Sequence, residues 1–341
     1  MFHYVREIKK SKFPNLKGLE FSDFKKQINY LLKNFNILSN EDFIEIIKTK
    51  KIPKKKSVLL TFDDGYIDHW KYVYPYLKEK KISGNFYPPV KVIENKKVLD
   101  VNKIHFILEK EQNRDKLLNY IFKFIKKYMN KDKDGLKIDK ISTLDRYDDK
   151  KTTLIKRLLQ TYLPHKIRKK IVDNLFKLIV GFNEKNFSKI LYMNENHIKE
   201  MFKDNMVIGS HGENHFWWKN LNYKNQFKEI KNSIEYFKKI GVYNENFSVC
   251  YPYGSYNLDT LKILKKFNVK FALTTKVGNL CNGNINKFLE YPRYNTNDFK
   301  LWNIKSKIKQ KKFKNGASKE LKVIDCKIKF LKEIMRKVKL I

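Results

Sequence analysis

The chain has 341 residues, 42% of them hydrophobic, so it is long enough to bury a large core and is not intrinsically disordered. Its formal net charge is +38, yet only seven of its 74 basic residues are arginine. Because proteins that read bases usually depend on arginine, this composition argues against a nucleic-acid partner. The charge fits an anionic substrate or an anionic membrane surface instead.

The cysteines and the apolar segments bear on the cellular location. Cys250, Cys281 and Cys326 are too few to form a disulfide framework. The first residues lack the charged start and the apolar run of a signal peptide, and no stretch approaches the roughly 18 apolar residues of a transmembrane helix. We therefore expect a cytoplasmic protein, and the sequence leaves its oligomeric state open.

Strand-like runs alternate with helical patterns near both ends of the chain. The pattern predicts strands over residues 2–5, 57–62, 84–87, 206–209, 247–250 and 271–275, and helices over residues 21–34, 72–80, 223–239 and 258–267. This alternation predicts a parallel α/β barrel, in which the carboxyl ends of the strands gather at one face.

The middle of the chain does not follow this alternation. From residue 103 to about 187 it is rich in lysine, helical in its period and poor in strand signals. We predict a barrel formed by residues 1–100 and 188–308, with a helical insertion at 101–187 that caps the site. Residues 309–341 are predicted to form a basic C-terminal helical extension.

Two adjacent carboxylates follow the predicted strand at 57–62. Neighbouring residues on a strand point to opposite faces, so Asp63 and Asp64 can share one site only where the strand ends and the backbone turns, which Gly65 permits. One carboxylate can then bind a metal while the other faces a water molecule. An Asp-Asp-Gly sequence by itself is often an ordinary solvated turn.

Two histidines follow the predicted strand at 206–209. His211 and His215 are four residues apart, a spacing that can bind one ion on a loop or on the first turn of a helix. Together with Asp64 they form a set of two histidines and one carboxylate. This set suits one divalent metal, with Zn²⁺ as the first expectation and Co²⁺, Ni²⁺, Mn²⁺ or Fe²⁺ as alternatives. The combination predicts metal-assisted hydrolysis.

At these residues the chain resembles the polysaccharide deacetylase family, the carbohydrate esterases that share the NodB homology domain. The first two motifs that carry the resemblance are Thr61-Phe62-Asp63-Asp64-Gly65-Tyr66 and Ser210-His211-Gly212-Glu213-Asn214-His215, and the third is Cys250-Tyr251-Pro252-Tyr253-Gly254. The resemblance covers roughly residues 1–100 and 190–300. It implies a distorted barrel of about seven strands.

The resemblance also implies roles for single residues. Asp63 would be the general base that deprotonates the attacking water, which the metal makes more acidic, and Asp64, His211 and His215 would hold that metal. The backbone N–H of Tyr253 would stabilise the oxyanion, since the preceding proline has no N–H to donate.

The chain departs from the family pattern at two points. The third motif has Cys250 where the family carries an arginine that pairs with the base, and Arg293 is either its substitute or part of a structural salt bridge. In addition, no histidine follows His215, so the usual general acid is missing. Asp63 returning its proton is one alternative; His105 is another, although it can equally be a packing residue, and His3 can also line the pocket.

The sequence therefore predicts a metal-dependent hydrolase that removes an N-acetyl group from an amino sugar in the biosynthesis of a surface polysaccharide or glycolipid. The sugar can be free or a nucleotide- or lipid-linked precursor. A hydrolase of another small amide, such as a sugar N-formyl group, uses the same residues. A carbohydrate-binding relative without catalysis is the alternative from a different class, although the intact Asp63 argues against it.

Overall fold

The computed structural model describes residues 1–94, 97–130 and 148–298. The predicted extension at 309–341 and the last ten residues of the predicted barrel lie outside these ranges. None of the helices in the described ranges combines the length and the apolar character needed to cross a bilayer.

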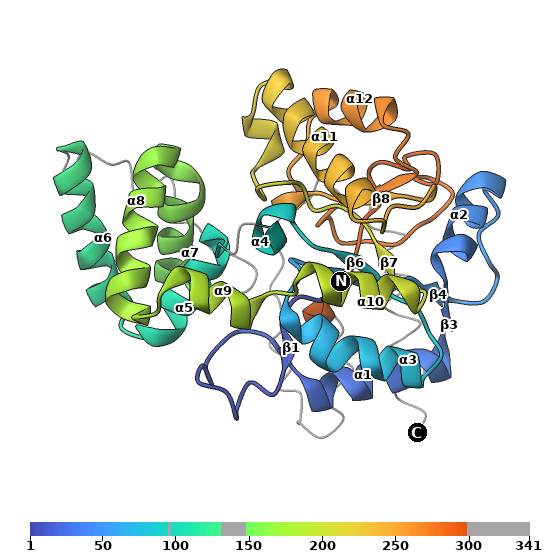
Figure 1. The fold of residues 1–341 in the computed structure, drawn as a ribbon, viewed down its shortest axis with the longest axis horizontal. Helices are drawn as coiled ribbons and strands as arrows, with labels where there is room; N and C mark the ends of the chain where they lie inside the picture. The colour runs from blue at the N-terminus through green and yellow to red at the C-terminus, as the bar shows by residue number, and fades with distance from the viewer. Residues whose placement is uncertain (95–96, 131–147, 299–341) are drawn as a thin grey trace, which may run out of the picture.

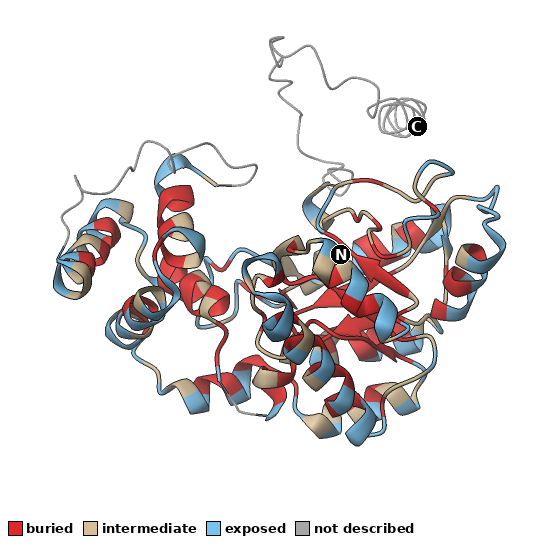
Figure 2. Ribbon diagram, turned by 90° about the horizontal axis from the view of Figure 1, so that it is seen from above, coloured by how far each residue is buried: buried red, intermediate tan, exposed pale blue. Residues whose placement is uncertain are grey.

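The strands form a row in which every ladder is parallel. The central ladder joins β5 (Thr61–Asp63), β6 (Asn85–Tyr87) and β7 (Val207–Ile208), and a second joins β8 (Ser248–Cys250) and β9 (Phe271–Leu273). Isolated parallel bridges extend the row: Phe2 with Phe62, Ser210 with Val249, and Leu273 with Tyr291. The residues of β5, β6, β8 and β9 are all buried, as expected for parallel strands covered on both faces (Figure 2).

The two ends of this row meet through single hydrogen bonds. The amino group of Met1 donates to the carbonyl of Tyr294 at 2.5 Å, and the N–H of Thr296 donates to the carbonyl of Met1 at 3.2 Å. Regular strand pairing does not continue across this junction among the described residues. The parallel α/β arrangement is as predicted, whereas a regular closed barrel of seven strands stays a prediction.

Two short ladders lie beside the row, and neither was predicted. They join β1 (Val5–Arg6) with β2 (Leu19–Glu20), and β3 (Asn36–Ile37) with β4 (Ser57–Val58). The predicted strand at 57–62 is thus divided into β4 and β5, because its first part pairs with β3 and its second part with β6. Two-residue strands have too little sequence to show a period.

Helices cover the strands in the order that the sequence pattern indicated. They are α1 (Phe21–Asn34), α2 (Asn40–Thr49), α3 (Tyr74–Glu79), α10 (Glu195–Lys203), α11 (Tyr223–Lys239) and α12 (Leu258–Lys266). Helix α1 shows why: Phe24, Ile28 and Leu31 recur at helical spacing and are buried. Helices α2 and α10 were not predicted, although Ser39 and Asp42 form a capping box at the start of α2.

The middle of the chain forms a helical lobe beside the strands (Figure 1). It contains α5 (Asp100–Lys110), α6 (Arg114–Met129), α7 (Lys150–Arg157), α8 (His165–Leu175) and α9 (Glu184–Leu191), while α4 (Val90–Glu94) leads into it. The side chain of Lys103 is almost fully buried, and its ammonium lies 2.5 Å from Asp173 and 3.0 Å from Glu184. The lobe thus pairs its buried charge internally, which is the condition for keeping a lysine inside a protein.

Candidate metal centre and active site

Asp63 and Asp64 lie where β5 ends and the chain turns. Asp63 is the last residue of the strand, whereas Asp64 and Gly65 have φ angles of 73° and 68°, in the left-handed region. The turn is tight, because a Cβ at Gly65 would lie 2.7 Å from the Cβ of Pro88. Both carboxylates are buried beside one site, as the sequence predicted.

His211 and His215 lie on the loop that follows β7, and both are buried. The φ angle of His215 is 59°, an unusual conformation for a residue other than glycine and one that often marks functional sites. The Nδ1 of His211 lies 2.7 Å from the carbonyl oxygen of Cys250. Because a carbonyl only accepts, Nδ1 carries the proton, and the Nε2 of the neutral ring is free to bind a metal.

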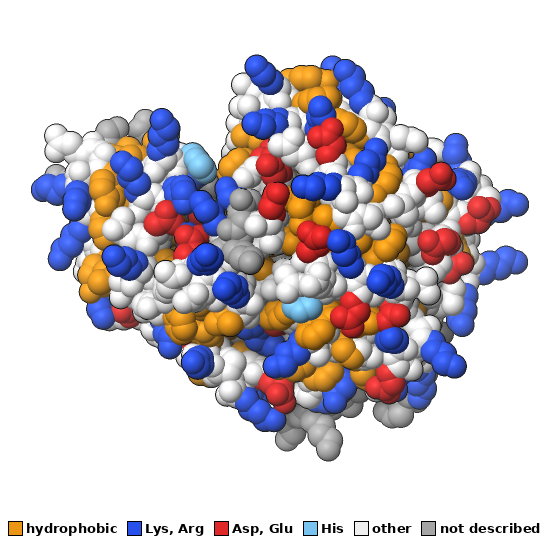
Figure 3. All heavy atoms as spheres, in the orientation of Figure 1, with side chains coloured by type: hydrophobic (Ala, Val, Ile, Leu, Met, Phe, Trp, Pro, Cys, Tyr) orange, Lys and Arg blue, Asp and Glu red, His pale blue; other side chains and the backbone are white. Residues whose placement is uncertain are grey.

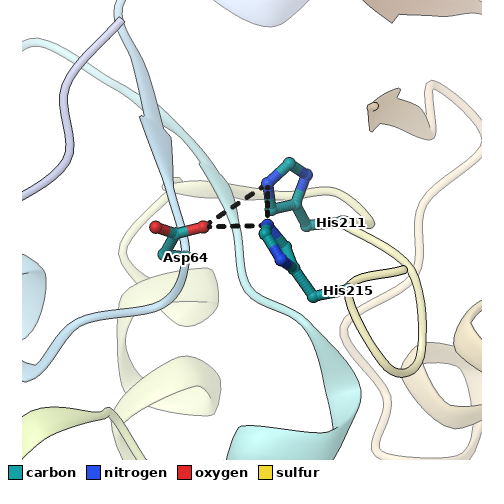
Figure 4. Close-up of side chains that lie close together, drawn as sticks. All are labelled: Asp64, His211 and His215. Carbon is teal, nitrogen blue, oxygen red and sulfur yellow. Dashed lines mark hydrogen bonds and ion pairs between the residues drawn. The ribbon is translucent and has the colours of Figure 1, made fainter. Parts of the chain in front are cut away.

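Three ligand atoms converge at this point (Figure 4). Oδ1 of Asp64 lies 3.5 Å from Nε2 of His211 and 3.4 Å from Nε2 of His215, and the two nitrogens are 3.2 Å apart. No lysine or arginine of the described ranges forms an ion pair with Asp64. Two imidazole nitrogens and one carboxylate oxygen at such close range fit one divalent metal ion.

Asp63 is held by Arg293, and not by the residue at the position of the missing arginine. Nη1 and Nη2 of Arg293 donate to the two carboxylate oxygens at 2.9 and 2.7 Å, and both side chains are buried. Burial by itself would raise the pKa of Asp63, but the charge and hydrogen bonds of Arg293 outweigh it and hold the pKa below its usual value. Cys250 lies against the same carboxylate, with Sγ 3.4 and 3.5 Å from its oxygens. Arg293 therefore makes the contact with Asp63 that the resemblance assigned to the motif arginine, although it comes from another segment.

Three further contacts fix the orientation of Arg293. Its Nε donates to the carbonyl of Thr274 at 3.0 Å, its Nη1 donates to the hydroxyl of Thr61 at 3.2 Å, and its backbone N–H donates to Lys276. The guanidinium is thus held at both ends, so Asp63 has little freedom to rotate. These contacts favour Arg293 as the substitute for the motif arginine, the first of the two alternatives that the sequence left open.

His3 lies beside Asp63. Its Nε2 is 4.0 Å from Oδ2 of Asp63, and 37% of the side chain is exposed. The backbone carbonyl of His3 accepts a hydrogen bond from Nε2 of His69 at 2.8 Å. The sequence had placed His3 on the pocket wall without a role.

His105 does not contact either carboxylate. Its Nδ1 lies 3.3 Å from the hydroxyl of Tyr4, and the ring of Tyr4 stacks on Tyr66 with centroids 4.0 Å apart. Burial lowers the pKa of His105 to about 3, and the charge of Lys156 adds to this effect. A ring that is neutral near pH 7 has no proton of the required acidity to give to a leaving amine.

Tyr253 lies next to the metal ligands in a strained turn. Its φ angle is 57°, and its backbone N–H forms no hydrogen bond with another residue in the described ranges. Its ring lies 4.6 Å from that of His215 and stacks on Trp217 with centroids 4.3 Å apart and planes at 7°. A free amide at this position fits the oxyanion donor that the resemblance implied.

Sequence reasoning missed the residues that orient Asp64. The hydroxyl of Tyr66 donates to Oδ2 of Asp64 at 2.6 Å and accepts from Nδ2 of Asn102 at 2.7 Å. Asn102 also accepts from the hydroxyl of Tyr192. The one available signal was Asn102 itself, a polar residue among the apolar residues of a predicted helix.

Comparisons with known proteins agree with this geometry. The sequence profile described as polysaccharide deacetylase matches residues 50–105 and 147–272, which make up more than half of the chain. A search of curated proteins found no match. His3 and Arg293 lie outside the matched residues, so their assignment rests on the structure.

Solved structures of deacetylases are similar to the chain. Streptococcus pyogenes deacetylase PplD, in complex with acetate, is 18% identical with a TM-score of 0.52, and the match covers 86% of this chain and 88% of that one. IcaB from Ammonifex degensii is 15% identical with a TM-score of 0.47 over 81% and 82% of the two chains. The deacetylase domain of BpsB from Bordetella bronchiseptica is 14% identical with a TM-score of 0.47 over 86% and 93%. At this identity the likeness to PplD bears on the fold alone.

The matched profile contains both of the motifs that supply Asp63, Asp64, His211 and His215. The chain therefore belongs to the polysaccharide deacetylase family and is a hydrolase acting on amide C–N bonds.

Proposed function

We propose that this protein removes the acetyl group from an N-acetylated amino sugar used to build a surface polysaccharide or glycolipid. The observation that carries the proposal is that the two carboxylates at the end of β5 have different partners. Asp64 converges with two histidines on one point, while Asp63 is paired with Arg293 and is not one of the three converging ligands. A site that only bound sugar would have no need for the second carboxylate.

Asp64, His211 and His215 would hold one divalent metal, for which Zn²⁺ is the first candidate. When bound, such an ion polarises the acyl carbonyl and makes water acidic enough to attack near neutral pH. The protein prepares its ligands for this: the Cys250 carbonyl selects the tautomer of His211, and the hydroxyl of Tyr66 orients Asp64.

Asp63 takes the proton from the attacking water. Because Arg293 keeps the carboxylate ionised and fixes its plane, the lone pairs that Arg293 does not use face the reaction in a constant orientation. The negative charge that develops on the acyl oxygen is stabilised by the backbone N–H of Tyr253. No side-chain substitution removes that donor.

His3 delivers a proton to the leaving amine. The support for this role is its position 4.0 Å from Asp63 together with its partial exposure, since a proton passed from Asp63 to His3 can reach the substrate. His105 is less suitable, because its ring is neutral near pH 7 and bonded to Tyr4. Return of the proton by Asp63 itself is the alternative.

Two other functions use the same residues. An N-formyl group or another small amide presents the same carbonyl to the site. The choice of acetyl as the acyl group is therefore itself part of the proposal. A carbohydrate-binding protein without turnover remains the alternative from another class. The cytoplasmic location stays a prediction.

The test is acetate release from N-acetylated sugars, nucleotide sugars and short oligosaccharides, using protein stripped of metal and then reloaded with Zn²⁺. We expect metal-dependent acetate from one of these classes. Release of formate from N-formyl sugars, with no acetate from N-acetylated sugars, would change the proposed acyl group from acetyl to formyl. Binding of sugars without any turnover in the reloaded protein would favour the non-catalytic alternative.

A further inference from the structure

A cleft opens beside the metal ligands and is bounded on its other side by the helical lobe. Its volume is about 300 Å³, the lower end of the range for small-molecule sites. Its lining includes His215 and Tyr253, Lys91 of α4, which is hydrogen-bonded to the loop that carries His215, and residues of α8 in the helical lobe. The space-filling view shows the surface hollowed between the helical lobe and the part of the molecule that carries α11 and α12 (Figure 3). A substrate whose acetamido group lies at the metal centre would extend along this cleft.

The side of the cleft next to the metal centre has an aromatic surface. Trp217 and Tyr253 stack almost parallel, and Nε1 of Trp217 is buried without a hydrogen-bond partner. An aromatic pair with one unsatisfied donor suits a ligand that is flat or apolar on one face and carries acceptor oxygens at its edge. A sugar ring has both properties.

Two cations that line the cleft have no carboxylate within ion-pair distance among the described residues. Nη1 of Arg168 donates to the carbonyls of Thr161 and Leu163 at 2.9 and 3.1 Å, and Nζ of Lys91 donates to the side chain of Asn214 at 2.9 Å. Neither forms an ion pair with a carboxylate of the described residues. Both are partly buried, so each loses hydration, and the nearest acidic influence on both is Asp100, which forms no ion pair with either.

Neighbouring cations add to the excess of positive charge in the cleft. Burial lowers the pKa of Lys91, and the charges of Lys97 and Lys169 lower it further. The pKa of His165 is also lowered, by burial and then by the charges of Arg168 and Lys169 among others. Two acidic residues, Asp100 and Glu184, also line the cleft, and Glu184 is already paired with Lys103. The lining of the cleft is therefore positive overall.

We propose that this cleft binds a phosphate or diphosphate group attached to the N-acetylated sugar, with Arg168 and Lys91 as its anchors. The inference rests on the proposed function for the position of the sugar, but the anion site itself is defined by the unpaired cations. Several cations around one space suit a group with more than one negative charge better than a single carboxylate. The flat guanidinium of Arg168 can bind two phosphate oxygens at once, whereas Lys91 acts as a point charge.

The first experiment measures binding without turnover, by titrating inorganic pyrophosphate into the Asp63→Asn protein at constant ionic strength. We expect Arg168→Ala and Lys91→Met each to weaken binding about tenfold, the effect of losing one hydrogen bond to a charged group. Lys265→Met, an exposed lysine of α12 away from the cleft, is the matched control and should bind as its parent does. Equal binding by all four proteins, or no binding at all, would overturn the anion site.

The second experiment measures acetate release from otherwise wild-type protein, comparing a neutral N-acetylglucosamine oligosaccharide with phosphorylated forms of the same sugar. Arg168→Ala should raise KM about tenfold for the phosphorylated sugars and leave KM for the oligosaccharide unchanged. An equal effect on both would overturn the proposal while leaving deacetylation intact. Conversely, Arg168-dependent pyrophosphate binding without acetate from any sugar would support the anion site and count against the proposed function.

The phosphorylated sugars also identify the carrier. They are a nucleotide diphosphate sugar, a polyprenyl diphosphate sugar and a sugar linked through a phosphodiester within a polymer. The one with the highest kcat/KM that also depends on Arg168 names the carrier, and any of the three supports the site. A preference for the neutral oligosaccharide over all three would overturn it.

Discussion

The end of the strand row and the cleft beside it differ in how their charged groups are paired. At the strand ends, Asp63 has two hydrogen bonds from Arg293, and Asp64 has one from Tyr66. In the cleft, the side chains of Arg168 and Lys91 form hydrogen bonds only with carbonyl and amide oxygens among the described residues. The groups assigned to chemistry are thus held in place by the protein, while those assigned to binding are left for the substrate to pair.

The largest expected effect comes from removing the metal, because the paired residues at the strand ends cannot replace it. A chelator should lower acetate release to the uncatalysed background, and Zn²⁺ should restore it. Restoration by Co²⁺, Ni²⁺, Mn²⁺ or Fe²⁺ would rank the metals. The thermal midpoint should also rise with added metal, because a ligand that binds only the folded state stabilises it. Full activity in protein without detectable metal would contradict the assignment of Asp64, His211 and His215.

His3→Gln should lower kcat by about 10² to 10⁴, the usual contribution of a general acid, with metal content unchanged. His197→Gln is the matched control, since His197 stacks on Trp70 away from the site. Unchanged turnover in the His3 variant would mean that Asp63 returns the proton itself.

Arg293→Met should lower turnover about 10- to 100-fold, because the base loses its fixed orientation. It should also destabilise the fold by about 3–5 kcal/mol, since it leaves the carboxylate of Asp63 buried and unpaired. The pair of Arg6 and Asp68 offers a control, with two contacts of 2.7 Å between the guanidinium and the carboxylate.

Arg6→Met should lower the thermal midpoint while leaving turnover unchanged at temperatures where the protein stays folded. Equal losses of turnover in the Arg6 and Arg293 variants would mean that Arg293 acts only through stability.

The smallest effect is expected for Tyr66→Phe, which removes one hydrogen bond to Asp64 and no ligand. Metal affinity should fall about tenfold, and turnover at saturating metal should be close to that of the wild type. Competition with a metal-binding dye measures the affinity directly. An unchanged affinity would show that the tight turn alone orients Asp64.

The candidate site was predictable where its residues follow one another in the chain. Asp63 and Asp64 are adjacent, and His211 and His215 are four apart, so their meeting required only that two strands of one parallel sheet, β5 and β7, end at the same edge. The pairing of Arg293 with Asp63 joins segments 230 residues apart, and the sequence left its role open. The contact of His3 with the same carboxylate was harder to predict, because His3 lies before β1 and is 60 residues from Asp63 in the chain.

The elements of the fold were likewise predictable where their sequence pattern is local and long enough to recognise. Helices such as α1 and α11 carry enough turns to show their apolar spacing, and the structure has them at the predicted bounds. Strands β2 and β3 have two residues each, and no periodic pattern can be read from them. The Trp217–Tyr253 stack joins the segments that follow β7 and β8, and the cations of the cleft come from α4 and α8. Both depend on how segments distant in the chain pack together, which no local pattern encodes.

The most direct test of the account compares Asp63→Asn with Asp64→Asn, measuring bound metal and acetate release in both. If Asp63 is the base and Asp64 a ligand, the first variant keeps its metal and loses nearly all turnover, whereas the second loses both. Turnover that survives Asp63→Asn at full metal content, or loss of metal from that variant, would contradict the separation of the two carboxylates.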